Sequence, residues 1–293
     1  MTKISAPRKE SFQFTNKLRN LVRRLAKRVA NRYYNVRLSL REEPLQVIFI
    51  LGHMRTGSSV FCHILNENKE VTGYGETQTT YRSAGDFDEL VRKVFWTYHN
   101  MKMDEKYVFD KILHEEYLPN PELLQDPRLK FIFIIRDPEE AIPSLIRNFN
   151  EVLTDSAKEL GIEYQGKRWT EEDALAYYTS ALSKLEEYAR AIDQKERCIF
   201  IRFDWFMGDT DRVFAQLQHF LDLKNPLSEN YQVSWRTGAW GIGDSSKYIY
   251  TGKLVRERQT KSMDISPEIY KQAKAVFERC SATLNECCTS IYS

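Results

Sequence analysis

The chain has 293 residues, 42% of them hydrophobic, which is enough for one α/β domain with a substantial core. No apolar run approaches the roughly 20 residues of a membrane-spanning helix, and we expect no signal peptide because the N-terminus lacks a compact apolar stretch. The five cysteines show neither a disulfide framework nor metal-ligand spacing. These features exclude a membrane-spanning or disulfide-stabilised protein and predict a cytoplasmic one.

The N-terminal segment 1–44 differs in charge from the rest of the chain. Residues 1–41 hold twelve Lys or Arg and one acid, Glu10. The net charge of the whole chain is +2, so the rest of the chain has a net charge of −9. Apolar residues recur here at helical spacing, with arginines between them: Leu18, Leu21, Val22, Leu25, Val29, Tyr33 and Val36. Three interpretations stay open: a helix packed on the acidic main domain, a helix on a membrane surface or other anionic partner, and a transit peptide or disordered leader. We expect no nucleic acid, since no binding motif accompanies the charge.

The most informative segment is VIFILGHMRTGSSVFCHIL, residues 47–65. An apolar strand runs into a glycine-bounded loop with one cation, and a helix with hydroxyls in its first turn follows. Backbone N–H groups, the helix dipole and the guanidinium then point to one place, which suits phosphate or sulfate oxygens. The segment predicts an anion site formed by Arg55, Thr56, Gly57, Ser58 and Ser59.

This loop departs from the Walker A pattern of kinases and NTPases. With Gly52 and Gly57 as the two Walker glycines, a serine occupies the lysine position and the cation is Arg55 instead. Such enzymes also hold Mg²⁺ with a carboxylate near a strand end. The next buried strand ends in Arg136 and Asp137, and an arginine there suits a second anion better than a metal. A P-loop nucleotide kinase or NTPase with an atypical Walker loop is therefore the alternative interpretation, and we expect no metal.

A second element, FIFIIRDPEEAIPSLIR, has an arginine at the end of a strand and a serine eight residues later, Arg136 and Ser144. Together the two elements resemble the sulfotransferase family, which uses 3′-phosphoadenosine 5′-phosphosulfate (PAPS) and releases adenosine 3′,5′-bisphosphate (PAP). The family's first loop binds the 5′-phosphosulfate and its second element binds the 3′-phosphate. The arginine in residues 55–59 is closer to bacterial and carbohydrate-modifying members than to the animal cytosolic enzymes, which have lysine.

The resemblance covers residues 45–260. Segment 202–223 is similar to the family's strand, acidic turn and helix, and segment 235–254 resembles the loop that closes over the adenine and the 3′-phosphate. In this loop the resemblance implies nucleotide binding by Arg236, Lys247, Thr251 and Gly252. A plain surface loop is the alternative.

Sulfuryl transfer requires cations at the donor, a positioned acceptor and a base for its proton. We expect Arg55 to be the first cation. Lys111, near the end of the strand YVFDKIL, resembles a lysine that follows the family's second strand and is expected to be the second cation, with an ordinary surface lysine as the alternative. Glu76, in GYGETQ, is similar to the glutamate that bacterial and carbohydrate-directed members use as the base.

Three other residues are candidates for the base. Animal cytosolic members use a histidine two residues after the lysine, but Leu113 stands there. His114 is one residue further, which on a strand would place it on the opposite face. His53 and Asp110 also lie near the expected strand ends.

Short apolar runs predict strands at 46–51, 107–112, 130–135 and 197–202. Helical patterns fall between and after them, at 58–67, 86–101, 138–153, 171–194, 209–222 and 266–290. The alternation predicts an α/β three-layer sandwich with a central parallel sheet, a P-loop-like strand–loop–helix and an additional N-terminal basic helix. We therefore expect a basic amphipathic arm over 1–44 and a sulfotransferase domain over 45–293.

The function expected from these features is transfer of a sulfuryl group from PAPS to an acceptor hydroxyl, without a metal. The acceptor is a carbohydrate, a lipid-linked glycan or a small natural-product alcohol, and the sequence carries no signal for an oligomeric state. A non-catalytic alternative is a degenerate member that serves as a basic, membrane-associated binding module. Peripheral membrane contact would use residues 1–41 in either case.

Overall fold

The computed structural model describes residues 9–98, 100, 102–152, 166–234, 237, 248–256 and 264–291. The chain divides into two compact units. The first comprises Met1–Pro44 with Phe95–Met103, and the second comprises Leu45–Val94 with Asp104–Ser293. No helix within the described ranges is both long and apolar enough to cross a membrane.

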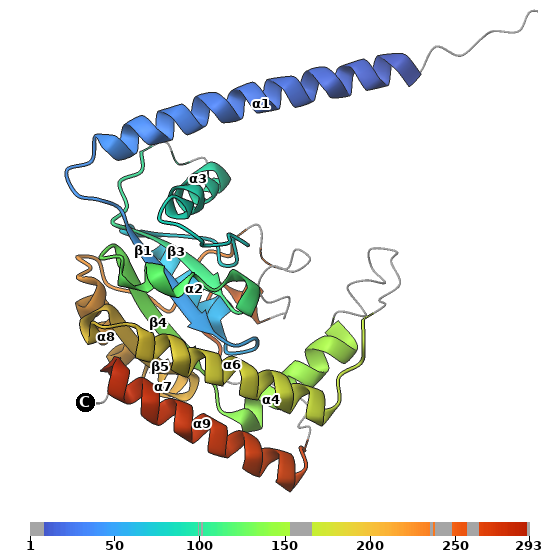
Figure 1. The fold of residues 1–293 in the computed structure, drawn as a ribbon, viewed down its shortest axis with the longest axis vertical. Coiled ribbons are helices and arrows are strands. Elements are labelled where there is room, and N and C mark those ends of the chain that lie inside the picture. The colour runs from blue at the N-terminus through green and yellow to red at the C-terminus, as the bar shows by residue number, and fades with distance from the viewer. Residues whose placement is uncertain are drawn as a thin grey trace, which may run out of the picture. The chain divides into compact units, whose positions relative to one another are not determined.

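The first unit contains the N-terminal basic helix that the sequence predicts. Helix α1 (Lys9–Ser39) is continuous over 31 residues (Figure 1). The buried ring of Tyr34 packs against Phe95, with 6.5 Å between the ring centroids. Arg37 donates to the Lys102 carbonyl at 2.6 Å, and Arg41 donates to the carbonyl of Met103. These contacts attach the C-terminal part of α1 to segment 95–103.

The second unit contains a six-stranded sheet in which every pair of neighbouring strands is parallel. Its order is β2–β3–β1–β4–β5–β6, with bounds β1 (Gln46–Gly52), β2 (Val71–Thr72), β3 (Tyr107–Ile112), β4 (Leu129–Ile135), β5 (Cys198–Arg202) and β6 (Thr289–Ser290). The longer strands are nearly continuous apolar runs, as strands buried on both faces require. Because β1 pairs with both β3 and β4, the segments that follow these three strands meet at one edge.

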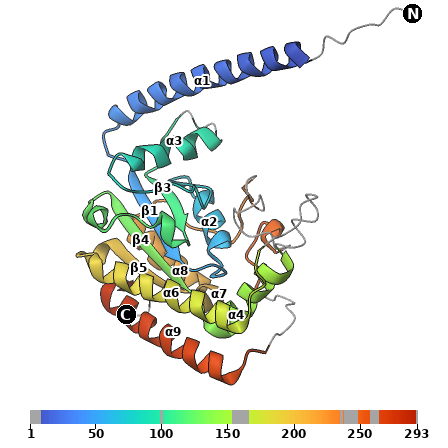
Figure 2. The ribbon, with the colours of Figure 1, turned by 45° about the vertical axis from the view of Figure 1, so that its right-hand side comes forward.

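Helices cover both faces of the sheet and confirm the predicted three-layer sandwich (Figures 1 and 2). Helices α2 (Ser58–Glu67), α7 (Phe203–Gly208) and α8 (Thr210–Leu221) share one core with Ile48, Ile132 and Ile199 of the strands. On the other face, α6 (Glu171–Ala191) packs against α9 (Pro267–Cys287), with α4 (Pro138–Arg147) beside them. The remaining elements are α3 (Asp86–Tyr98), η1 (Glu115–Tyr117), η2 (Pro121–Gln125), η3 (Asn148–Val152), η4 (Lys195–Arg197) and η5 (Ile249–Thr251).

Most helices end a few residues earlier than the sequence predicts, and two of them pass directly into another element. The helix expected over 138–153 ends as an α-helix at Arg147 and continues as the π-helix η3. The helix expected over 266–290 ends at Cys287, because Cys288 turns to an extended conformation and the chain then pairs with β5 as strand β6. Apolar periodicity continues through both boundaries, so it does not reveal them.

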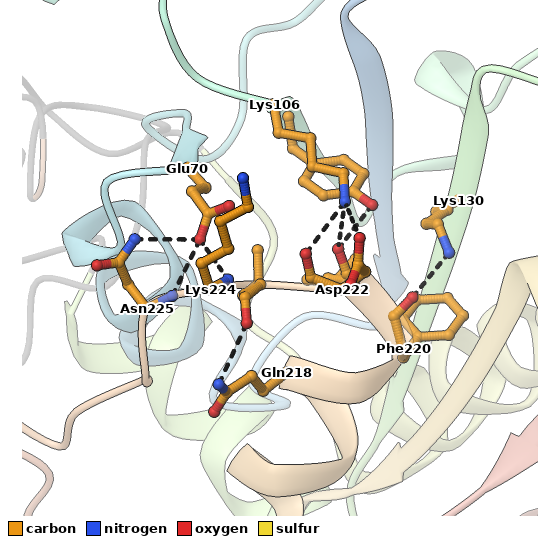
Figure 3. Close-up of polar contacts among 11 residues, drawn as sticks. Glu70, Lys106, Lys130, Gln218, Phe220, Asp222, Lys224 and Asn225 are labelled. Carbon is orange, nitrogen blue, oxygen red and sulfur yellow. Dashed lines mark hydrogen bonds and ion pairs between the residues drawn. The ribbon is translucent and has the colours of Figure 1, made fainter. Parts of the chain in front are cut away.

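Charged side chains hold the C-terminal end of α8 at the amino-terminal edge of the sheet (Figure 3). Lys106 donates to the last carbonyls of the helix and to the carboxylate of Asp222, the latter at 2.8 Å. Lys130 donates to the Phe220 carbonyl at 2.7 Å. Cations are favourable here because the final carbonyls of a helix carry partial negative charge. Glu70 accepts two backbone N–H groups of the loop that follows, which fastens α8 far from the carboxyl edge of the strands.

Candidate active site

Four of the predicted site residues lie along the carboxyl edge of four neighbouring strands. In the order of the sheet, Glu76 follows β2, Lys111 is the penultimate residue of β3, Arg55 follows β1 and Arg136 follows β4. The carboxyl edge is where α/β sheets of this kind bind ligands. The sheet order therefore brings together residues that are up to 81 positions apart in the chain, as the hydrogen bond between Arg136 and the Arg55 carbonyl shows.

The predicted anion loop, residues 55–59, spans the junction of β1 and α2: its first three residues precede the helix, and Ser58 and Ser59 begin it. Arg55 and Gly57 have positive φ angles of 67° and 83°. A Cβ on Gly57 would lie 2.1 Å from Cε2 of Phe203, so both the backbone conformation and the packing require glycine. Gly57 is also the N-cap of α2, and the helix start has no side-chain cap. The N–H groups of Ser58 and Ser59 thus begin a helix whose dipole favours an anion.

The two anion motifs form one network. Arg55 Nε donates to Ser144 Oγ at 3.0 Å, and Arg136 Nη1 donates to the Arg55 carbonyl at 3.1 Å. Arg136 is also paired with Glu140, at 2.7 Å, and its guanidinium lies 4.5 Å from the ring centroid of Phe203. The residues expected to bind opposite ends of a nucleotide are therefore connected directly, a contact that their spacing in the sequence does not reveal.

Lys111 is buried rather than an ordinary surface lysine. Its side chain is 2% exposed, donates to Ser59 Oγ at 3.1 Å and pairs with Glu76 at 2.8 Å. The contact with Ser59 brings the cation of β3 to the first turn of α2. A carboxylate, an ammonium and a hydroxyl thus lie together beside the anion loop.

His53 supports the loop instead of facing a cavity. It is fully buried, its Nδ1 lies 2.8 Å from the Met54 carbonyl, and its Nε2 accepts the Arg136 N–H at 3.2 Å. Burial lowers its pKa to about 4, so the ring is neutral near pH 7. Two tyrosines of α6 also hold these segments: Tyr177 accepts the Met54 N–H, and Tyr178 donates to the Arg136 carbonyl. The sequence predicts a helix over 171–194 but gives no sign of either hydrogen bond.

Asp110 likewise has a positioning role. Its carboxylate accepts the N–H and the hydroxyl of Thr77 at 2.9 and 2.7 Å, and the hydroxyl of Tyr81 at 2.7 Å. Burial raises its pKa from 3.8 to about 6, against the lowering effect of these hydrogen bonds. Asp110 therefore fastens the segment that follows Glu76 to strand β3.

A cavity of about 150 Å³ adjoins the Glu76–Lys111 pair. Both Leu113 and His114 line it. Strand β3 ends before these two residues, so the alternation of side chains along a strand does not apply to them. The rings of His114 and Tyr117 meet edge to face, with 6.5 Å between their centroids. The full lining is Glu76, Gln78, Asp110, Lys111, Leu113, His114, Glu116 and Tyr117.

The loop predicted to close over the nucleotide is described only in part. Arg236 and Lys247 lie outside the described residues. Thr251 donates from its hydroxyl to the Tyr248 carbonyl at 2.8 Å, and Gly252 has a φ of 70° and accepts the N–H of Tyr231. Within the described part of the chain, Thr251 and Gly252 thus form a turn of their own and make no hydrogen bond to Arg55 or Arg136.

Part of this α/β chain is similar in sequence to a known protein family. Residues 122–226 match the model of the sulfotransferase family. The matched segment carries Arg136 and Ser144, and it supports the resemblance found in the sequence. No curated protein matches the chain.

Several solved sulfotransferase structures are similar to this one. The sulfotransferase domain from the curacin biosynthetic pathway is 14% identical, with a TM-score of 0.49, and the match covers 82% of this chain and 99% of that one. A sulfotransferase from Alicyclobacillus acidocaldarius is 15% identical, with a TM-score of 0.44 and coverage of 83% and 96%. A mouse sulfotransferase complexed with PAP is 12% identical, with a TM-score of 0.45 and coverage of 81% and 85%.

Proposed function

We propose that this protein is a sulfotransferase that moves a sulfuryl group from PAPS to an acceptor hydroxyl, in line and without a metal, and releases PAP. One observation carries the proposal: the buried Lys111 reaches Ser59 of the anion loop and pairs with Glu76 at 2.8 Å. Cations for the donor and a carboxylate for the acceptor proton are therefore side by side, as sulfuryl transfer requires.

The groups around the loop suit the anionic donor. Guanidinium, ammonium, hydroxyl and helix-terminal N–H groups are all donors of hydrogen bonds to phosphate and sulfate oxygens. In this proposal residues 55–59 and Lys111 hold the 5′-phosphosulfate, and Arg136 with Ser144 holds the 3′-phosphate. Arg55 and Lys111 stabilise the charge that develops on the leaving phosphate. The remaining contacts to the nucleotide are proposed to come from Arg236, Lys247, Thr251 and Gly252.

The cavity beside Glu76 is the proposed place of the acceptor. Glu76 takes the proton from the acceptor hydroxyl, and the Lys111 ammonium keeps the carboxylate oriented. His114 is the second candidate for this role, since it lines the same cavity. A volume near 150 Å³ is enough for a single six-membered ring. The acceptor proposed is therefore an alcohol on a sugar, on a lipid-linked glycan or on a small natural product, with one ring bound in the cavity.

The substitution Glu76→Gln tests the proposed base. We expect kcat to fall by about 10²- to 10⁴-fold, because the amide cannot accept the proton, while the affinity for PAP changes little. The measurement is transfer of labelled sulfate from PAPS to a panel of sugars, lipid-linked glycans and small alcohols. Glu115→Gln is the matched control, since Glu115 is exposed and bonded to Ser180. Equal turnover of Glu76→Gln and the unaltered chain would exclude Glu76 as the base.

A further inference from the structure

Helix α1 carries an apolar stripe that the contacts of its own unit do not use. The stripe consists of Leu21, Val22, Leu25, Val29 and Val36, each at least 50% exposed, with Val29 at 71%. At about 100° of rotation per residue, these side chains fall on one side of the helix over about four turns. A continuous apolar surface of this length is unusual on a soluble protein unless it contacts something.

The opposite side of α1 is the one that attaches the helix within the N-terminal unit. Tyr34, which packs against Phe95, lies roughly 165° around the helix from the middle of the apolar stripe. Arg37 and Arg41 donate to the carbonyls of Lys102 and Met103 close to the same side. The helix thus uses one side for internal contacts and presents another, apolar side outward from them.

Cations border the apolar stripe along its length. Arg24 and Arg28 are exposed on one flank, and the exposed Arg32 lies within the stripe. Residues 1–41 hold twelve cations, and Glu10 is their only acid. Long cationic side chains can place their stems along an apolar surface while their charged ends reach a layer of negative charge. The apolar stripe is therefore complementary to an apolar layer, and the cations beside it are complementary to negative charge at the surface of that layer.

We propose that α1 lies on an anionic lipid surface, with the apolar stripe at the boundary between headgroups and acyl chains. The exposed apolar residues are Leu and Val, whereas protein interfaces concentrate their binding energy in aromatic anchors. Every charged residue from Leu21 to Arg41 is a cation, which matches the uniform charge of an anionic leaflet. This proposal is independent of the sulfotransferase activity, because no residue of α1 belongs to the candidate active site.

Vesicle sedimentation of the full chain tests the proposal with phosphatidylcholine alone and with added phosphatidylserine. We expect binding to the anionic vesicles, weakened by salt, and little binding to the neutral ones. Val29→Glu should weaken binding at least about tenfold, since it removes a buried apolar side chain from the lipid boundary. Asn35→Glu is the matched control: it makes the same change in charge at an exposed position outside the stripe, and it should weaken binding by a few-fold at most.

Three results would overturn this inference. The first is no binding of the unaltered chain to anionic vesicles. The second is equal loss of binding in Val29→Glu and Asn35→Glu, which would leave the apolar stripe without a role. The third is a lower melting temperature of Val29→Glu together with unchanged binding to anionic vesicles, which would mean that the stripe packs on protein. Binding of PAP by each variant is measured in parallel, so that a defect in folding is recognised separately.

Discussion

At the scale of single residues, two buried titratable groups hold the segments that carry the candidate catalytic side chains. The neutral ring of His53 accepts the Arg136 N–H, and Asp110 accepts three hydrogen bonds from Thr77 and Tyr81. Burial shifts their pKa values in opposite directions, that of His53 down to about 4 and that of Asp110 up to about 6. Each shift favours the uncharged form, so their effects on stability oppose each other between about pH 4 and pH 6.

Asp110→Asn separates the two effects. Because the pKa of Asp110 is raised on folding from 3.8 to about 6, the folded chain keeps a proton there that the unfolded chain has released. The unaltered chain therefore loses stability from this group as pH rises through the window between about pH 4 and pH 6. Relative to Asp110→Asn, its free energy of unfolding should fall by about 2 kcal/mol from pH 4 to pH 7, measured by urea unfolding. If the free energies of unfolding of the two proteins depend on pH in the same way, the pKa of Asp110 is not raised on folding and the prediction is wrong.

At the scale of elements, the strand–loop–helix β1–α2 depends on the close approach of α7. The ring of Phe203, the first residue of α7, occupies the space where Gly57 would carry a Cβ, and the same ring lies against the guanidinium of Arg136. The loop conformation and the position of the second arginine are therefore set by one aromatic side chain. This contact comes from a segment about 145 residues downstream of the loop, so it depends on the completed sheet.

Gly57→Ala tests this dependence. The added methyl carbon would lie 2.1 Å from Phe203 Cε2, and the alanine would have to adopt a φ of 83°. We therefore expect a loss of at least about 2 kcal/mol of stability. The affinity for PAP should also fall, by at least about tenfold, as the loop shifts. Gly85→Ala is the control, since the nearest atom to its Cβ is Ser83 Oγ at 3.7 Å, and its effect should stay within about 0.5 kcal/mol. Thermal and urea unfolding measure the first effect, and calorimetry measures the second. Similar effects of the two substitutions would contradict the role given to Phe203.

The sequence predicts the elements of the site better than the contacts between them. The strands that end close to Arg55, Lys111 and Arg136 are evident because buried parallel strands are short apolar runs between polar residues. Helix α2 has the predicted bounds. The hydrogen bond from Arg55 to Ser144 and those from the α6 tyrosines are not evident, since they join segments far apart in the chain. The joint position of Leu113 and His114 was also missed, because it depends on where β3 ends.

At the scale of the whole molecule, the groups with proposed functions lie along the carboxyl edge of the sheet in the order of its strands. The cavity and Glu76 lie by β2 and β3, the loop of Arg55 follows β1, and Arg136 follows β4. Acceptor, transferred group and nucleotide would thus be arranged in the order of the strands. The amino-terminal edge carries structural contacts instead, in which Lys106 and Lys130 hold the end of α8. The N-terminal unit contributes a separate surface through the apolar stripe of α1.

Calorimetric titration with PAP tests the central claim, that this sheet edge binds a nucleotide phosphorylated at both ends without a metal. We expect PAP to bind with the same affinity in Mg²⁺ and in excess chelator, and Arg55→Ala to weaken binding by about 10- to 100-fold. Arg279→Ala should bind as the unaltered chain does, since Arg279 pairs with Glu186 on the surface of α9. Absence of PAP binding by the unaltered chain, or Mg²⁺-dependent binding of ATP in its place, would contradict the sulfotransferase proposal.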